Sequence, residues 1–188
     1  MSRSTVVAAL PNLISLARLL AVPLAVWLIL TDKFTAAFWL FVFAGVSDAL
    51  DGFIAKHFGV RTMLGGYLDP LADKALLVSV YVALGYRGHI EIWLVILVVF
   101  RDVLIVGGAI LYHTLTHSLK MQPLFISKLN TFAQIAFAAV LLARLGLAFD
   151  DRGLVDILVH VVAATTFLSG AAYLAIWGWR IARMDDPR

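Results

Sequence analysis

Apolar residues fill six long stretches of the chain, and shorter segments richer in polar residues and glycine separate them. Each stretch has about 20 residues, the length that an α-helix needs to cross the hydrocarbon core of a bilayer. The pattern predicts an all-α, polytopic membrane protein with six transmembrane helices. The predicted spans are residues 9–30, 35–55, 66–86, 90–112, 126–147 and 154–179.

Composition supports a lipid environment. Of the 188 residues, 62% are hydrophobic and 14% are charged, and the mean hydropathy is +0.95. A globule of this size has too little interior to bury so much apolar side chain, so we exclude a soluble enzyme fold. The basic residues are scattered, so the net charge of +3 does not indicate nucleic-acid binding. There is no cysteine, and no internal repeat or linker divides the chain, so we expect a single domain over residues 1–188.

The distribution of cations predicts the orientation, because lysine and arginine gather on the cytoplasmic side. With a cytoplasmic N-terminus, six spans return the C-terminus to the cytoplasm, and the inner segments hold eight cations against four outside. The first apolar run shows no cleavage site of a signal peptide. We therefore expect a multi-pass protein of the cell (inner) membrane.

Besides Glu91, Lys128, Arg144 and Asp156 near the span ends, eight charged residues fall inside the apolar spans, where each costs on the order of 3 kcal/mol at a helix centre. A single one, such as Arg18 or Asp102, can be a snorkelling or helix-pairing residue. Four aspartates within 26 residues cannot be explained in this way, because they would repel one another. The predicted topology places them near the cytoplasmic side, which indicates a polar cavity open to the cytoplasm. The eight are Arg18, Asp48, Asp51, Asp69, Asp73, Lys74, Arg101 and Asp102.

The spacing of the four aspartates predicts a metal site. Asp48 and Asp51 are three residues apart and Asp69 and Asp73 are four apart, so each pair shares one helix face. A short glycine-containing loop joins the two helices, which makes them antiparallel neighbours. Two carboxylate pairs that face each other between two neighbouring helices suit one or two Mg²⁺ or Mn²⁺ ions, which prefer oxygen ligands.

Two further residues indicate that a phosphate group approaches this site. Gly52 leaves the backbone bare directly after an aspartate, and Lys56 adds a cation one turn later. Metal and phosphate in a membrane cavity suggest chemistry on a phosphorylated lipid, in which a carboxylate takes the proton of an attacking hydroxyl. No serine or histidine is obviously placed to form a covalent intermediate, so direct in-line displacement is the simpler mechanism.

The same residues resemble the signature of the CDP-alcohol phosphotransferase family. Seven of the eight signature positions agree, and the exception is Lys56, where the family usually has arginine. Lysine keeps the charge but lacks the planar fork that binds a phosphate through two hydrogen bonds. The matching pattern is Asp48-x-x-Asp51-Gly52-x-x-Ala55-Lys56, then eight residues, then Gly65-x-x-x-Asp69-x-x-x-Asp73.

The resemblance implies six transmembrane helices, CDP-diacylglycerol as donor, CMP as leaving product and a homodimer in the bilayer. It implies two divalent metal ions, Mg²⁺ or Mn²⁺, shared by the four aspartates, with Asp73 also acting as the base. It further implies a set of residues that bind the CDP donor. These are Asn12, Arg18, Gly52, Ala55, Lys56 and Gly65.

The resemblance also implies a glycerol-containing acceptor, and it assigns Arg101 and Lys128 to this acceptor. The segments around these two residues, Arg101-Asp102 and Ile126-Ser127-Lys128-Leu129-Asn130-Thr131, look most like those of the CMP-forming cardiolipin synthases, whose acceptor is phosphatidylglycerol. Phosphatidylglycerophosphate synthases, which use glycerol 3-phosphate, typically carry further basic residues where this chain has Ala109 and Asn130. A phosphodiester carries one charge and a monoester nearly two, so we expect phosphatidylglycerol, with glycerol 3-phosphate as the alternative. A small ion or proton-coupled transporter is a remote alternative, which leaves the glycines between the aspartates unexplained.

Overall fold

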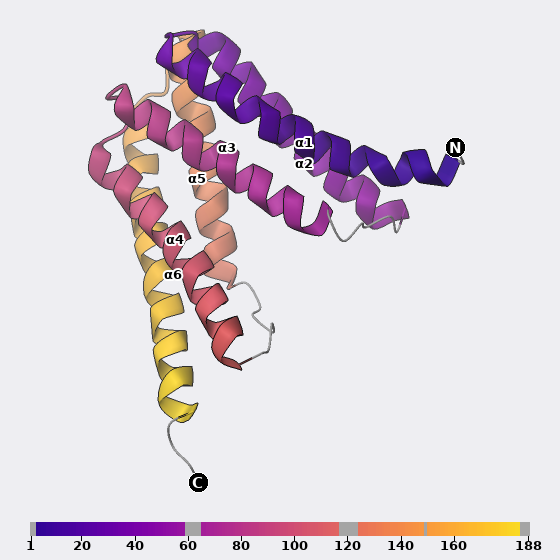
Figure 1. Ribbon diagram of the computed structural model, residues 1–188. Helices are drawn as coiled ribbons and strands as arrows, with labels where there is room; N and C mark the ends of the chain where they lie inside the picture. Colours follow the sequence, from indigo (N-terminus) through magenta and orange to yellow (C-terminus); the bar gives the residue numbers. More distant parts are fainter. Residues whose placement is uncertain (1–2, 59–64, 117–123, 149, 185–188) are drawn as a thin grey trace. The chain divides into compact units, whose positions relative to one another are not determined.

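A computed structural model of the chain describes the backbone of residues 3–58, 65–116, 124–148 and 150–184, and most side chains within 14–48, 71–110, 124–148 and 150–177. The described backbone is helical apart from short connections, which confirms the predicted all-α class (Figure 1). The helices match the predicted spans to within a few residues, although the first begins at residue 3 and the last continues to residue 184. They are α1 (Arg3–Leu30), α2 (Phe34–Phe58), α3 (Gly65–Tyr86), α4 (Ile92–Thr116), α5 (Phe125–Leu147) and α6 (Leu154–Met184).

Within the part of the chain whose side chains the structure describes, three helices are long and apolar enough to cross a membrane. They are α4 over Ile92–Ile110, α5 over Phe125–Leu147 and α6 over Leu154–Trp177, with mean hydropathies of 2.3, 1.5 and 1.8. The described side chains of α1 and α2 contain shorter apolar segments, at Ile14–Leu30 and Phe34–Asp48. The number of spans and the side on which the termini lie stay predictions.

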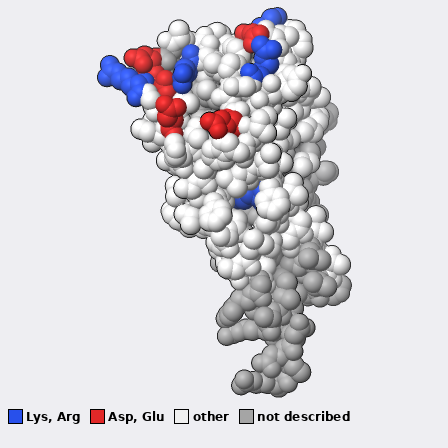
Figure 2. Space-filling view, turned by 90° about the vertical axis from the view of Figure 1, so that its left-hand side faces the viewer, with Lys and Arg blue, Asp and Glu red and all other residues white. Residues whose placement is uncertain are grey.

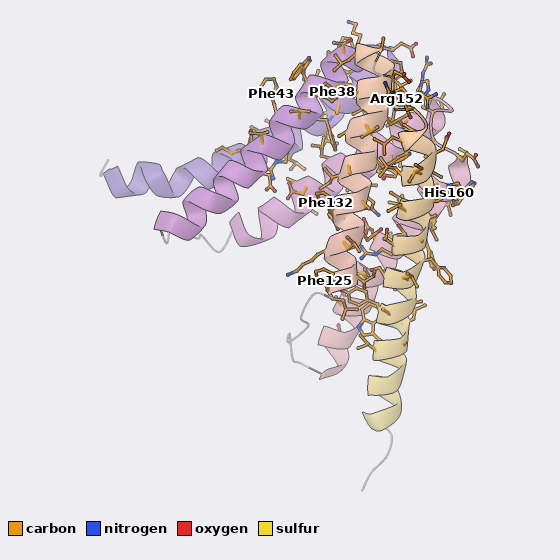
Figure 3. All side chains as sticks on the ribbon, turned by 180° about the vertical axis from the view of Figure 1, so that it is seen from behind. Phe38, Phe43, Phe125, Phe132, Arg152 and His160 are labelled. Carbon is orange, nitrogen blue, oxygen red and sulfur yellow. The ribbon has the colours of Figure 1, made fainter. Side chains whose placement is uncertain are left out.

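The distribution of side chains is inverted relative to that of a water-soluble protein. Phe43, Phe125 and Phe132 are 65%, 80% and 70% exposed on the outer flanks of α2 and α5 (Figure 3). In contrast, Asn130 and Gln134 are completely buried. Extended apolar flanks are costly in water and favourable in lipid, where buried polar groups pair between helices. The described surface is therefore that of a membrane protein.

The described residues form two compact units, the first made of Met1–Ile90 and Ala138–Arg152. In this unit α1 packs against α2 and α3, and Ile29, Tyr81 and Leu84 are buried in its core. The end of α5 meets the start of α2 so closely that only glycine fits at position 146. A Cβ atom there would lie 2.6 Å from the backbone carbon of Phe34.

The connections at one end of the first unit are fixed by polar and aromatic contacts. Arg87, after α3, forms an ion pair with Asp32, after α1. Lys33 lies over the Trp27 ring at 4.4 Å from its centroid, and Phe34 packs edge-on against a histidine of the α3–α4 connection. Figure 2 shows charged side chains gathered in a few patches, whereas most of the described surface on this face carries none.

The second unit comprises Glu91–Phe137 and Gly153–Arg188. In it α4 packs along α6, and Leu94, Val98 and Val162 are fully buried. Gly108 of α4 gives room to the Trp177 ring of α6, because a Cβ atom at position 108 would lie 1.8 Å from that ring. Close packing through a small residue is common between membrane helices, which lack a hydrophobic driving force for association.

Candidate active site

Three charged side chains from three helices meet inside the first unit. Arg18 comes from α1, Asp48 from α2 and Asp73 from α3. The guanidinium Nη1 of Arg18 donates a hydrogen bond to Asp48 Oδ1 at 2.8 Å, and the same nitrogen donates to Asp73 Oδ1. Packing of α1 against α2 and α3 therefore places one cation between two carboxylates.

The three side chains differ in exposure. The Arg18 side chain is 3% exposed, whereas Asp48 and Asp73 are 44% and 41% exposed. A buried guanidinium loses its hydration and needs compensation, which the two carboxylates supply. The cation in turn reduces the repulsion between the carboxylates. The group carries one net negative charge, with its anionic side toward the more accessible region.

The structure thus brings together two of the four aspartates that the sequence singled out, one from each predicted pair. Asp51 lies on α2 one turn after Asp48, and Asp69 lies on α3 one turn before Asp73. The side chains of these two residues lie outside the described part of the chain. The same is true of five of the residues assigned to the CDP donor, which are Asn12 on α1, Gly52, Ala55 and Lys56 on α2, and Gly65 on α3.

The residues present fit a divalent cation. One nitrogen atom of Arg18 accommodates an oxygen from α2 and an oxygen from α3, so carboxylates of both helices can share one positive centre. Mg²⁺ and Mn²⁺ prefer such hard oxygen ligands. No group of three or more metal-binding side chains forms among the side chains that the structure describes. Asp51 and Asp69 would have to complete the ligand set.

A second buried charged group occupies the second unit. Arg101 of α4 is 3% exposed and donates from Nη1 to Asp102 Oδ1 at 2.9 Å. Its Nη2 donates to Ser127 Oγ of α5 at 2.6 Å, and its Nε to Ser169 Oγ of α6 at 3.2 Å. Most of the five donors of the guanidinium are therefore used inside the protein, and Asp102 balances its charge. The structure places Arg101 as a link between three helices.

Lys128, the other residue assigned to the acceptor, has a different environment. It lies in the first turn of α5, and its side chain is exposed. An exposed ammonium group keeps its donors for a ligand, whereas the donors of Arg101 are largely taken. Of the two residues, Lys128 is the one whose charge is accessible.

Sequence reasoning did not identify the polar contacts between α5 and α6. Asn130 Oδ1 accepts hydrogen bonds from Thr165 Oγ1 at 3.0 Å and from Thr166 Oγ1 at 2.8 Å, and all three residues are buried. A signal was present, since Ser127 and Asn130 are three residues apart within one apolar span. Polar residues at helical spacing in a membrane helix indicate hydrogen bonds to a neighbouring helix.

Fold and site together define a helical membrane protein in which a buried arginine of α1 joins carboxylates from the two helices that pack on α1. The family model described as CDP-alcohol phosphatidyltransferase matches residues 8–177. The match covers most of the chain, so the chain belongs to the CDP-alcohol phosphatidyltransferase family. This confirms the family predicted from the spacing of aspartate and glycine residues.

The curated relatives of the chain carry the names of two different enzymes. A chloroplastic CDP-diacylglycerol–glycerol-3-phosphate 3-phosphatidyltransferase of rice is 35% identical over 182 residues, which cover 87% of this chain and 55% of the rice protein. The CMP-forming cardiolipin synthases of rat and human are each 34% identical over 180 residues, or 87% of this chain and 60% of theirs. The chain thus spans somewhat more than half the length of these relatives.

Proposed function

We propose that the chain is an integral-membrane phosphatidyltransferase of anionic phospholipid synthesis. It transfers the phosphatidyl group of CDP-diacylglycerol to an acceptor hydroxyl and releases CMP. The observation that carries this proposal is the meeting of Asp48 and Asp73 at Arg18, on helices of a chain that belongs to this family. The signature positions around these residues supply the remaining groups that the reaction needs.

The roles of the residues follow from their chemistry. Asp73 accepts the proton of the acceptor hydroxyl through the carboxylate oxygen that does not bind Arg18. The hydroxyl oxygen then forms a bond to the phosphorus that carries diacylglycerol. The bond between this phosphorus and the bridging oxygen of the diphosphate breaks, and CMP leaves with the electron pair. We assign the cationic Lys56 to the donor phosphates.

Two divalent ions, Mg²⁺ or Mn²⁺, belong to the proposed site. When bound, they supply positive charge that polarises the diphosphate and stabilises the leaving phosphate. Asp48, Asp51, Asp69 and Asp73 would hold them, and the remaining donor contacts come from the signature and the first helix. These contacts are Asn12, Arg18, Gly52, Ala55 and Gly65.

For the acceptor we propose phosphatidylglycerol, which makes the product cardiolipin. At the positions where glycerol 3-phosphate enzymes typically carry extra cations, this chain has Ala109 and the buried Asn130, whose oxygen is held by two threonines. Arg101 is neutralised by Asp102, which leaves Lys128 with an accessible charge. A single cation suits the single charge of a phosphodiester better than the nearly double charge of a monoester.

Glycerol 3-phosphate is the second candidate acceptor. The name of the rice relative, at 35% identity, favours it. Under either alternative we propose six transmembrane helices, cytoplasmic termini, a site open to the cytoplasm, a homodimer and a location in the cell inner membrane. The three long apolar helices support the membrane location.

The proposal is tested by incubating the purified, detergent-solubilised protein with CDP-diacylglycerol and Mg²⁺ or Mn²⁺, and by measuring CMP. Phosphatidylglycerol and glycerol 3-phosphate are offered in parallel, and the lipid product is identified by mass spectrometry. We expect metal-dependent CMP release and cardiolipin formation with phosphatidylglycerol. Release of CMP with glycerol 3-phosphate but not with phosphatidylglycerol would identify glycerol 3-phosphate as the acceptor. Absence of release with both acceptors, or release that persists in chelator, would refute the metal-dependent activity, and transport would then be the remaining alternative.

A further inference from the structure

Arg18 contacts the carboxylates from the enclosed side of the site. It is 3% exposed, whereas both aspartates are more than two-fifths exposed. Its Nη1 atom engages Oδ1 of Asp48 and Oδ1 of Asp73. Since both carboxylates are partly exposed, a ligand can approach them from the accessible side. A divalent ion bound by these two residues would therefore share its carboxylates with a buried guanidinium.

The charge of Arg18 stabilises the two carboxylates when the site holds no metal, and it opposes a metal ion when one is bound. Without metal, the guanidinium offsets the repulsion between two carboxylates held close together. With a divalent ion held by Asp48 and Asp73, the fixed positive charge of Arg18 would repel that ion and would also reduce the charge density of the shared carboxylates. Charges that share carboxylates interact strongly at the effective dielectric of a partly buried site.

We propose that Arg18 is an internal counter-cation of the carboxylate site, which holds Asp48 and Asp73 together before metal binds and competes with the metal once it has bound. This inference rests on the proposed function, since it concerns the same carboxylates. It gives Arg18 a positioning role toward the aspartates, whereas the family resemblance places it among the donor-binding residues. It explains why a costly buried arginine lies beneath an anionic site that itself needs divalent cations.

Metal affinity provides a test that does not depend on turnover. Purified Arg18→Gln, Arg18→Lys and unmodified protein are titrated with Mn²⁺ in the absence of CDP-diacylglycerol, and free Mn²⁺ is measured by electron paramagnetic resonance. We expect Arg18→Gln to bind Mn²⁺ about tenfold more tightly or better, because a competing charge is removed. Arg18→Lys keeps that charge and should stay within about threefold of the unmodified protein.

The matched control is Arg87→Gln. Arg87 also pairs with an aspartate of the same unit, but its ion pair with Asp32 lies at an exposed connection. This variant should leave the Mn²⁺ affinity unchanged. Equal or weaker Mn²⁺ binding by a folded Arg18→Gln variant would overturn the inference. A tenfold change in the Mn²⁺ affinity of Arg18→Lys would also overturn it. This second variant keeps the inference testable if Arg18→Gln does not fold.

Thermal unfolding supplies an independent readout. In chelator, Arg18→Gln should unfold at a lower temperature than the unmodified protein, because the carboxylates then repel each other without compensation. Added Mn²⁺ should restore most of this lost thermal stability, and a loss that Mn²⁺ leaves unchanged would contradict the inference.

Unmodified protein that binds Mn²⁺ but releases no CMP would refute the proposed function alone. Normal CMP release with unchanged Mn²⁺ affinity in Arg18→Gln would refute the inference alone.

Discussion

Arg18 and Asp73 form an ion pair although 55 residues separate them along the chain. The contact joins α1 to α3, and the same guanidinium nitrogen reaches Asp48 on α2. The position of the carboxylates therefore depends on how three helices pack and not on local sequence alone. A change that shifts any of the three helices would alter the separation of the two carboxylates.

Replacement of Asp73 tests its assignment as the base. Asp73→Asn keeps the size of the side chain but removes the group that takes the proton of the acceptor hydroxyl. We expect CMP release to fall by about 100-fold or more, since proton transfer by a positioned residue contributes that much to a rate. Binding of CDP-diacylglycerol, measured by equilibrium titration, should largely persist. Near-normal turnover in this variant would show that another residue is the base.

The lysine at the arginine position of the signature leads to a second prediction. Lys56→Arg restores a planar fork that can make two parallel hydrogen bonds to a phosphate. We expect an apparent KM for CDP-diacylglycerol that is unchanged or about twofold lower, with kcat little affected. Steady-state CMP release at varied donor concentration measures both. A severalfold rise in KM would indicate a site built specifically around lysine.

Arg101 is expected to act mainly on stability. It is 4% exposed in its side chain and linked to Asp102, Ser127 and Ser169. Arg101→Met removes the cation that pairs with the buried carboxylate of Asp102, so we expect a loss of about 3 kcal/mol in the free energy of unfolding. Denaturation in detergent, followed by circular dichroism, measures this loss.

The control for this variant is Arg87→Met, which removes an exposed ion pair and should cost less than about 1 kcal/mol. Steady-state kinetics separates the structural role of Arg101 from the acceptor contact that the resemblance implies. A folded Arg101→Met protein of nearly full stability, with a strongly raised KM for phosphatidylglycerol and an unchanged KM for donor, would favour the acceptor contact.

The sequence predicted the helices well because lipid imposes a length and an apolar composition that can be read directly. It also singled out Asp48 and Asp73, since carboxylates in apolar spans are costly and their spacing is regular. It placed Arg18 in the same site but did not predict its ion pairs with these aspartates, because partners of buried charges depend on which helices pack together. Thr165 and Thr166 were missed for a related reason, since small polar residues cost little in a helix and gain a role only through a neighbour such as Asn130.

The contact between α5 and α2 supplies the final prediction, which concerns Gly146. A Cβ atom at this position would lie 2.6 Å from backbone atoms of Phe34 and Thr35, and Thr35 Oγ1 already donates to the Gly146 carbonyl at 2.5 Å. Backbone cannot yield as a flexible side chain can, so Gly146→Ala should destabilise the protein by about 1–3 kcal/mol. Gly45→Ala on α2 is the matched control, since nothing lies within 4 Å of its added Cβ atom. That variant should be neutral or about 0.5–1 kcal/mol more stable, because alanine favours the helix. Equal unfolding free energies for the two variants would show that α2 moves aside at this contact without cost.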